Sequence, residues 1–356
     1  VIDRERNFDY DGEDVEAIPH VTDEIIKRIQ FAGGKENADV VVVELGGTAG
    51  EYQNALYYEA SRILAHNKKN KVVHVHVSYL PTPSHLGEPK TKPTQLSVRT
   101  LNSMGILPDF IVTRAEKPMD ERRRARLALF CSVDAENVID NVDLPSAYET
   151  PLYLAKQKFD EKILNLLELP LKKQNLSNWE AMTRTIGSKK EKTVNLAIVG
   201  KYFATGEYQL RDSYAALMDA IDHACWQLAV KANVRWIQAE NVEKGSNEYL
   251  SEADGIVVPI GWGARGVEGK IKAINFARVH KVPYLGLCYG MQLAVVEYAR
   301  NVLGLAGAHT TECDADTAHP VIHTNIGQDE NLLRRAYGGT MRLGRWECQV
   351  KDNTLA

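Results

Sequence analysis

The stretch Pro283-Tyr-Leu-Gly-Leu-Cys288-Tyr-Gly290-Met-Gln292 predicts an apolar strand that turns sharply at a cysteine into a helix running to about Val302. Its G-x-C-x-G form puts a glycine on each side of the thiol, where a tight strand-to-helix turn needs them. The helix N-terminus favours the thiolate and offers N–H groups to an oxyanion. An arbitrary free cysteine is more often buried in a core. The flanking glycines instead favour an exposed, acylating nucleophile at Cys288.

Apolar runs of strand length alternate with helix-period segments on both sides of this turn. The alternation predicts an α/β fold with mostly parallel sheets. Strands are expected at 40–44, where the run should be buried, and at 72–77, 110–113, 194–199, 234–238, 255–260 and 282–287. Helices are expected at 22–32, at 151–167 and at about 211–230.

The length of 356 residues suits two domains, each large enough to bury its own core. The polar segment 172–192 lacks an apolar period and is predicted to connect them. We therefore expect an N-terminal domain over 1–170, a linker over 171–192 and a C-terminal domain over 193–356.

The composition limits the classes of partner. A hydrophobic content of 44% with 25% charged residues is that of a globular protein. The net charge of −4 gives no field that would attract nucleic acid or anionic lipid, and no apolar run is long enough to span a membrane. Five cysteines without a C-x-x-C pair argue against a disulfide framework or structural zinc. We expect a cytoplasmic protein that binds neither nucleic acid nor membrane.

The motif from Gly286 to Gln292 resembles the nucleophile motif of class I glutamine amidotransferases. In that family the thiolate attacks the glutamine carboxamide, and a later His and Glu activate the thiol. His319-Pro320 is followed by valine and does not fit the family's His-Pro-Glu. We expect that dyad beyond Ala356, and we expect further sequence before Val1, where the chain does not start with Met.

Upstream, Pro259-Ile-Gly-Trp-Gly-Ala-Arg-Gly266 resembles the family's glycine-rich oxyanion loop. Read without the family, it is only a glycine-rich turn between a strand and a helix. Ile260 stands where the family usually has glycine, and a β-branched residue does not easily adopt a positive φ. The resemblance implies glutamine-binding or oxyanion roles for Gly261, Tyr289, Gln292 and Glu312.

Hydrolysis of glutamine releases ammonia, which enzymes of this kind transfer to an acceptor. The N-terminal half of the chain has to indicate which acceptor this is. Lys90-Thr-Lys-Pro-Thr-Gln95 combines basic and hydroxyl side chains at a helix start, which suits a triphosphate but by itself also suits a solvated loop. The segment resembles the pyrimidine-nucleotide motif of CTP synthases. Family-like segments extend over nearly the whole chain and include 43–50, 124–131, 310–312 and 338–344.

This resemblance implies roles for residues of the N-terminal half. Glu44 would bind Mg²⁺ and Arg114 would contact ATP. The residues implied in binding UTP or CTP are Glu51, Tyr52, Gln53, Lys90, Thr91, Lys92, Pro93, Thr94, Gln95 and Arg126. Gln53 replaces a carboxylate of the family, which is expected to alter nucleotide affinity or feedback by CTP. The family's phosphate-binding Gly-Lys loop does not precede Val1, so ATP binding by this chain is expected to be incomplete.

The implied architecture is a P-loop-like parallel-sheet synthetase domain followed by a class I glutamine amidotransferase domain. The implied enzyme is a ligase of pyrimidine nucleotide biosynthesis. It uses Mg²⁺ and ATP to phosphorylate O4 of UTP, and ammonia from glutamine displaces the phosphate to give CTP. GTP would activate the glutaminase, CTP would inhibit, and a homotetramer is expected. Two alternatives stay open: another glutamine-dependent synthetase, and a degenerate non-catalytic regulatory or filament subunit.

Overall fold

The structure is a computed structural model. It describes residues 1–67, 70–85, 87–201, 204–205, 208–209, 214–245, 250–325, 327–334, 336, 347 and 349–353. The chain divides into two compact units, Val1–Gly187 and Ser188–Ala356. Each unit is built on a parallel sheet with helices on both faces, so the predicted α/β class is confirmed.

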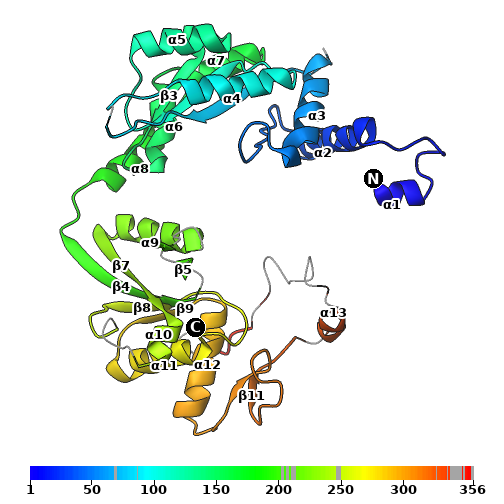
Figure 1. The fold of residues 1–356 in the computed structure, drawn as a ribbon. Coiled ribbons are helices and arrows are strands. Elements are labelled where there is room, and N and C mark those ends of the chain that lie inside the picture. The colour runs from blue at the N-terminus through cyan, green and yellow to red at the C-terminus, as the bar shows by residue number, and fades with distance from the viewer. Residues whose placement is uncertain are drawn as a thin grey trace. The chain divides into compact units, whose positions relative to one another are not determined.

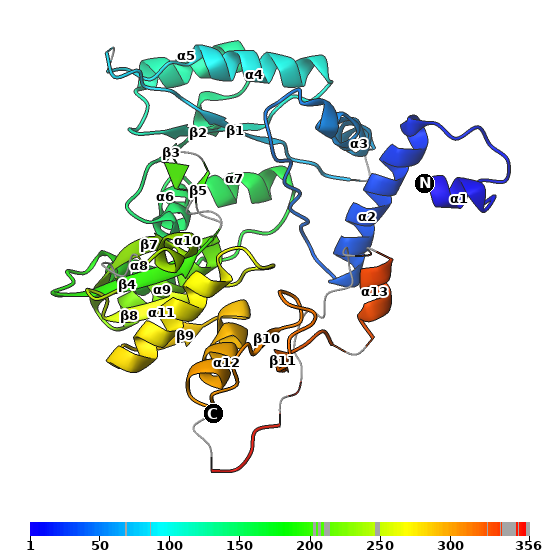
Figure 2. The same ribbon diagram turned by 60° about the horizontal axis from the view of Figure 1, so that its bottom comes forward.

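The first unit contains a three-stranded parallel sheet (Figure 1). Its strands, in spatial order, are β1 (Val75–Tyr79), β2 (Phe110–Ala115) and β3 (Val138–Val142). Four helices cover it: α4 (Lys92–Ser103), α5 (Glu121–Cys131), α6 (Thr150–Ala155) and α7 (Phe159–Leu166). Figure 2 shows α4 and α5 on one face of the sheet and α6 and α7 on the other.

Alternate residues of β2 point into two separate cores. Ile111 and Ala115 pack with Leu127 of α5 on one face, and Phe110 and Val112 pack against Phe159 and other apolar side chains of α6 and α7 on the opposite face. Helix α5 starts where the Asp120 carboxylate accepts the Arg123 N–H at 2.8 Å. Burial on both faces explains why the first half of this middle strand, Phe110–Val112, is continuously apolar.

The remaining helices of this unit lie outside the three-stranded sheet. They are α1 (Ile2–Arg6), α2 (Thr22–Lys35), α3 (Ala55–His66) and α8 (Ser177–Gly187), with short helical turns at Ala17–Val21, Tyr52–Asn54, Ala135–Asn137 and Ala147–Glu149. Helix α8 occupies the middle of the segment expected to be an irregular linker. Its Trp179 indole donates to the Tyr148 carbonyl at 2.6 Å, so the segment is tied to the first unit.

The prediction of a buried strand at 40–44 is wrong. The run has no strand geometry, and Val42 is 90% exposed. A strand buried on both faces needs neighbouring strands and covering helices, and no strand in the described part of the chain pairs with this run. Within the run, the Val41 side chain lies against Gly33 of α2, and the continuation at Leu45 and Ala49 packs against Tyr58 of α3 and Leu101 of α4.

Other boundaries of the first unit differ from expectation. The strand expected at 72–77 forms at Val75–Tyr79, and β3 was not predicted. The helix expected at 151–167 is broken between α6 and α7, where Lys158 has a left-handed φ of 56°. Helix α2 does not end at position 32 as expected but continues through Gly33 and Gly34 to Lys35.

The second unit contains a four-stranded parallel sheet in the order β7-β4-β8-β9. Its strands are β4 (Lys192–Gly200), β7 (Val230–Gln238), β8 (Gly255–Val258) and β9 (Tyr284–Gly286). Its principal helices are α9 (Ala215–Gln227), α10 (Ala239–Glu243), α11 (Val267–His280) and α12 (Tyr289–Asn301). Smaller elements are β5 (Ala204–Thr205), β6 (Tyr208–Gln209), β10 (His309–Thr310), β11 (Pro320–Ile322) and α13 (Asp329–Leu333).

All four strands predicted in this unit are present, with ends that shift by up to four residues. Ile198 and Val257 pack with Met218 of α9 on one face of the sheet. Val199 and Val258 point to the opposite face, where α11 and α12 bury their apolar sides. The helix expected at about 211–230 is α9, and positions 211–213 lie outside the described residues.

Candidate active site

The carboxyl ends of β8 and β9 lie next to each other in the sheet of the second unit. Val258 pairs with Gly286, and the Leu287 N–H donates to the Val258 carbonyl at 3.0 Å. The chain leaves β8 into the loop 259–266 and leaves β9 into Cys288, so this loop and the thiol belong to the same edge. In open parallel sheets that edge is the usual location of ligand sites.

Cys288 forms the turn between β9 and α12. Its φ of 52° and ψ of −103° are unusual for a residue with a side chain, and the residue is exposed at the N-cap of α12. A Cβ added at Gly290 would lie 2.0 Å from the Val258 carbonyl oxygen, and one at Gly286 would lie 2.7 Å from the Gly290 carbonyl carbon. The predicted strand, sharp turn and helix are therefore confirmed, and both glycines are required by close backbone approach.

The loop 259–266 is bonded to the start of α12 and to the segment after β10. Tyr289 is buried, and its hydroxyl donates to the Gly263 carbonyl at 3.2 Å and contacts Cys313 Sγ at 2.8 Å. Glu312 Oε1 accepts the Gly263 N–H at 2.5 Å. Positive φ angles in the loop occur at Gly263 and Gly266 and not at Ile260. The half-buried Gln292 lies one turn into α12 and donates its N–H to the Cys288 carbonyl at 3.1 Å.

Two buried lysines beneath the loop were missed by the sequence interpretation. Lys201 follows β4 and is 3% exposed; Lys270 of α11 is 0% exposed. Their ammonium groups lie 5.8 and 5.5 Å from the centre of the Tyr289 ring, within cation–π range. A Cβ at Gly261 would lie 2.9 Å from Lys270 Nζ and 3.2 Å from Lys201 Cε, so the lysines pack directly under this glycine.

Burial lowers the pKa of both ammonium groups. It lowers the pKa of Lys270 to about 8, with the nearby Lys201 charge acting in the same direction. Burial, followed by the charge of Arg265, also lowers the pKa of Lys201. The sequence does contain a signal for Lys270, because it lies three residues after Val267 and four before Ile274, on the buried stripe of α11.

The expected nucleotide segment of the first unit begins α4. Thr91 is the N-cap, Pro93 lies in the first turn, and the fully buried Thr94 shares a 2.8 Å hydrogen bond with Ser78 of β1. Lys90 Nζ lies 2.5 Å from Glu88, whose carboxylate also binds Arg123 of α5. The half-buried Gln95 donates to the Thr91 hydroxyl at 3.1 Å. The exposed Lys92 is the first residue of the helix.

The other expected nucleotide residues are dispersed over the first unit. Glu51 closes its own turn by accepting the Thr48 N–H at 2.8 Å and the Gln53 amide at 2.7 Å, and Tyr52 is 98% exposed. Arg114 pairs with Asp143 at 3.0 Å, Arg126 lies over the Phe130 ring, and Glu44 is exposed. No hydrogen bond or ion pair among the described residues joins Glu44 or Glu51–Gln53 to Lys90–Gln95.

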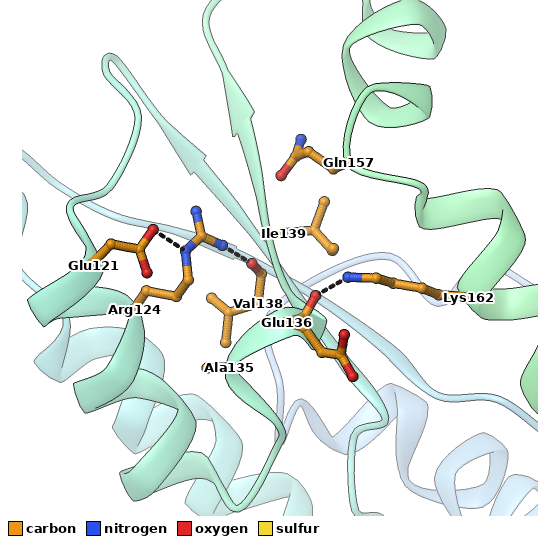
Figure 3. A pocket seen from close by; sticks show the side chains of 8 residues that line it. All are labelled: Glu121, Arg124, Ala135, Glu136, Val138, Ile139, Gln157 and Lys162. Carbon is orange, nitrogen blue, oxygen red and sulfur yellow. Dashed lines mark hydrogen bonds and ion pairs between the residues drawn. The ribbon is translucent and has the colours of Figure 1, made fainter.

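A pocket of about 380 Å³ lies near the amino end of β3 (Figure 3). Arg124 donates to the Val138 carbonyl, lies 3.6 Å from Glu121 and pairs with the buried Asp140 at 2.5 Å. On the other side Lys162 donates to the Glu136 carbonyl. These contacts are internal to the fold, so Arg124 belongs to the packing of α5 on β3 rather than to a solvated helix face.

The described part of the chain contains no cluster of three His, Cys, Asp or Glu side chains able to hold a metal ion. Among the same residues no helix is long and apolar enough to cross a membrane. The family-like segment 338–344 lies outside the described residues.

Comparison with known families assigns both units. Residues 1–169 match the model described as CTP synthase N-terminus, and residues 209–345 match the model described as Glutamine amidotransferase class-I. The two matches define a synthetase domain followed by a class I glutamine amidotransferase domain.

Individual relatives agree with this assignment over the whole chain. A CTP synthase of Caldanaerobacter subterraneus subsp. tengcongensis is 45% identical over 100% of this chain and 65% of its own length. A CTP synthase of Pyrococcus furiosus is 44% identical over 100% of this chain and 64% of its own. The chain therefore belongs to the CTP synthase family and spans just under two thirds of the length of these relatives.

Similarity also extends to solved structures. One of them is titled Trypanosoma brucei CTPS glutaminase domain with bound acivicin and is 34% identical over 36% of this chain and 49% of that chain. The TM-score is 0.34, so the likeness is one of sequence and adds nothing to the description of the fold.

Proposed function

We propose that the second unit hydrolyses glutamine and that the full-length protein uses the ammonia to convert UTP to CTP. The observation that carries the proposal is the backbone of Cys288, with φ 52° and ψ −103° at the start of α12 and beside the loop 259–266. A thiol held this way is presented to a substrate carbonyl, while backbone N–H groups face the developing oxyanion.

In this mechanism the Cys288 thiolate attacks the carboxamide carbon of glutamine and forms a tetrahedral oxyanion. Collapse breaks the C–N bond, ammonia leaves with the proton that the thiol gave up on forming the thiolate, and a glutamyl thioester remains on Cys288. Water then hydrolyses the thioester to glutamate and restores the thiol. Glu312 and Gln292 are proposed to bind the polar groups of the substrate, while Gly261 and Tyr289 form the wall behind it.

The first unit is proposed to bind the nucleotides. The start of α4, with Lys90, Thr91 and Lys92, provides cations and N–H groups for the UTP phosphates. Magnesium in nucleotide sites is usually held by one or two carboxylates together with the phosphates. The exposed carboxylate of Glu44 can provide one such ligand, and the bound ion would neutralise phosphate charge during transfer. We further propose roles for Arg114 towards ATP and for Arg126 and Glu51–Gln53 towards the pyrimidine nucleotide.

Regulation and assembly are proposed from family membership. The full-length protein would be activated by GTP, inhibited by CTP and assembled as a homotetramer, as expected of a CTP synthase. These properties are tested by assaying the amination at varied GTP and CTP and by measuring the mass of the particle in solution.

The glutaminase assignment is tested by covalent labelling. A glutamine-analogue alkylating agent should label Cys288, and glutamine should protect it. Cys288→Ala should lose the label, while Cys313→Ala, which removes the thiol beside Tyr289, should keep it. Labelling that survives Cys288→Ala would refute the assignment.

The acceptor is tested with the full-length protein, Mg²⁺, ATP and either glutamine or ammonium chloride. UTP should be aminated in both cases, and Lys90→Ala should raise the half-saturating UTP concentration by about tenfold or more, since a charge-assisted contact is lost. Amination of a different acceptor would identify another glutamine-dependent synthetase. Failure with both nitrogen sources would indicate a non-catalytic subunit.

A further inference from the structure

Most carbonyl groups of the loop 259–266 are held by buried side chains, whereas those of Ala264 and Gly266 accept backbone N–H groups of α11. Lys201 Nζ donates to three of them: those of Trp262, of Gly263 at 3.1 Å and of Arg265 at 3.1 Å. Three further bonds complete the set: Lys270 Nζ to Pro259 at 3.3 Å, the Tyr214 hydroxyl to Ile260 at 3.4 Å and the Tyr289 hydroxyl to Gly263 at 3.2 Å. Five of the eight loop carbonyls are thus turned towards buried donors.

Lys201 is the centre of this arrangement. An ammonium group has three N–H donors, which equals the number of loop carbonyls that it binds. The attachment is also reciprocal, because the Arg265 guanidinium donates to the backbone carbonyl of Lys201 at 2.7 Å and pairs with Glu240 at 2.6 Å. The charge is not a solvated surface charge, since Lys201 is 3% exposed.

Holding a carbonyl fixes the direction of the next N–H. In a trans peptide the C=O of one residue and the N–H of the following residue point in opposite directions. The Trp262 carbonyl points down to Lys201, and the N–H of Gly263 accordingly points to the exposed carboxylate of Glu312. By the same rule the Ile260 carbonyl, bound by Tyr214, directs the N–H of Gly261 away from the core.

We propose that Lys201 is a positioning residue: its ammonium group fixes the peptide groups that follow Trp262, Gly263 and Arg265, and so holds the loop 259–266 in the conformation in which the Gly261 N–H is directed at the carbonyl oxygen of glutamine on Cys288. The proposal rests on the proposed glutaminase function. Lys201 itself touches neither the thiol nor the substrate in this role. It acts through the loop, whose one β-branched residue, Ile260, keeps a non-glycine backbone conformation.

The charge, and not only the bulk, of Lys201 is essential to this role. A neutral amine would present two donors and a lone pair to three carbonyl oxygens, and a methylene chain would present no donor. Unpaired buried carbonyls are costly, so without the ammonium the loop should rotate its peptides towards water.

The test is chemical rescue of Lys201→Ala, with labelling of Cys288 by a glutamine-analogue alkylating agent as the first measurement. The variant should label about ten- to a hundredfold more slowly, a loss somewhat below that for removing an oxyanion donor outright. Reaction with iodoacetamide, which needs no oxyanion hole, should change less than about threefold by the same reasoning. Propylammonium, which replaces the missing chain and charge, should restore analogue labelling, while propan-1-ol should not.

Lys272→Ala is the matched control, because this exposed lysine of α11 also donates to a backbone carbonyl, that of Glu243 at 2.6 Å, but lies outside the loop. It should label at the wild-type rate. Lys201→Met keeps most of the volume and should show the same loss as Lys201→Ala without rescue. This second variant covers the case in which the alanine protein does not fold.

Hydrogen exchange of the peptide containing 259–266 separates the two proposals. Exchange should be faster in Lys201→Met than in the wild type and unchanged in Lys272→Ala. If the analogue fails to label even the wild type, the glutaminase proposal fails. The hydrogen-exchange rate of the loop peptide then remains as the test of whether Lys201 orients the loop. Wild-type exchange in Lys201→Met, or rescue by propan-1-ol equal to that by propylammonium, would overturn the positioning role.

Discussion

The carboxylate of Glu312 accepts a hydrogen bond from the backbone N–H of Gly263, with 2.5 Å between Oε1 and N. The two residues are far apart in sequence, and their contact links the segment after β10 to the loop beside Cys288. An ammonium group of glutamine that bound Glu312 would compete for the same oxygen. Substrate binding and loop position are therefore expected to be coupled through this carboxylate.

Glu312→Gln should weaken binding of a glutamine analogue to the second unit. The amide can still accept the Gly263 N–H but has no charge for an ammonium group, and a charge-assisted bond is stronger by roughly 1–2 kcal/mol. The half-saturating concentration of the alkylating analogue should rise about tenfold, with the maximal labelling rate nearly unchanged. Asp314→Asn, which neutralises an exposed carboxylate of the same turn, should leave both values as they are.

Gly290→Ala should strongly destabilise the second unit. The added Cβ would lie 2.0 Å from the Val258 carbonyl oxygen, and a strand backbone cannot move aside as a side chain can. A loss of about 3 kcal/mol is expected in urea unfolding. In Gly255→Ala the Cβ meets a Leu196 methyl group at 3.2 Å, so that variant should lose about 1 kcal/mol or less. Equal losses would contradict the close approach of α12 to β8.

Lys270→Met should change how stability depends on pH. Burial lowers the pKa of the Lys270 ammonium from 10.5 to about 8, so between these values the unfolded chain holds a proton that the folded protein has released. The wild type must therefore gain stability from this group as the pH rises through that window, by up to about 3 kcal/mol.

The measurement is the difference in unfolding free energy between Lys270→Met and wild type at pH 7.5 and at pH 10. The variant should have its greatest relative stability at the lower pH and lose that advantage at the higher one. Lys272→Met, on the exposed side of the same helix, should show no such trend. A pH-independent difference for Lys270→Met would argue against a buried charge at this position.

Arg124→Met should destabilise the first unit by about 3 kcal/mol, because it leaves the buried Asp140 carboxylate without its charged partner. Two weaker bonds to Asp140 would remain: the Met119 N–H at 3.2 Å and the Thr113 hydroxyl at 3.4 Å. The exposed neighbour Arg122 provides the control, and Arg122→Met should stay within about 0.5 kcal/mol of wild type. The same loss in both variants would show that the ion pair with Asp140 is not the cause.

The features predictable from sequence are those with short-range causes. The turn at Cys288 follows from two nearby glycines and the apolar run before them, and the strands of the second unit are continuous apolar segments. Strand β3 was not predicted because it contains Asp140 and Asn141. The charge of the buried Asp140 is balanced by Arg124, which precedes it by 16 residues, and no local pattern marks that pairing. The break at Lys158 carries neither glycine nor proline to mark it.

The candidate site shows the same division. Its nucleophile and loop have local signatures, whereas the side chains that hold the loop come from other elements. Lys201 follows β4 and Tyr214 precedes α9, and neither has a spacing that connects it to the loop. The prediction of a strand at 40–44 was wrong although its local signature is strong, because an apolar run becomes a strand only where another strand pairs with it.

That run has a practical consequence for handling the protein. Consecutive valines at 40–43, between 41% and 90% exposed, combine high β-propensity with no charge, and β1 borders the described sheet with one side unpaired. The run 40–43 of one molecule can therefore form backbone hydrogen bonds with the unpaired edge of β1 in another molecule. We therefore expect Val42→Lys, which places a charge in the middle of this run, to reduce aggregation at high protein concentration.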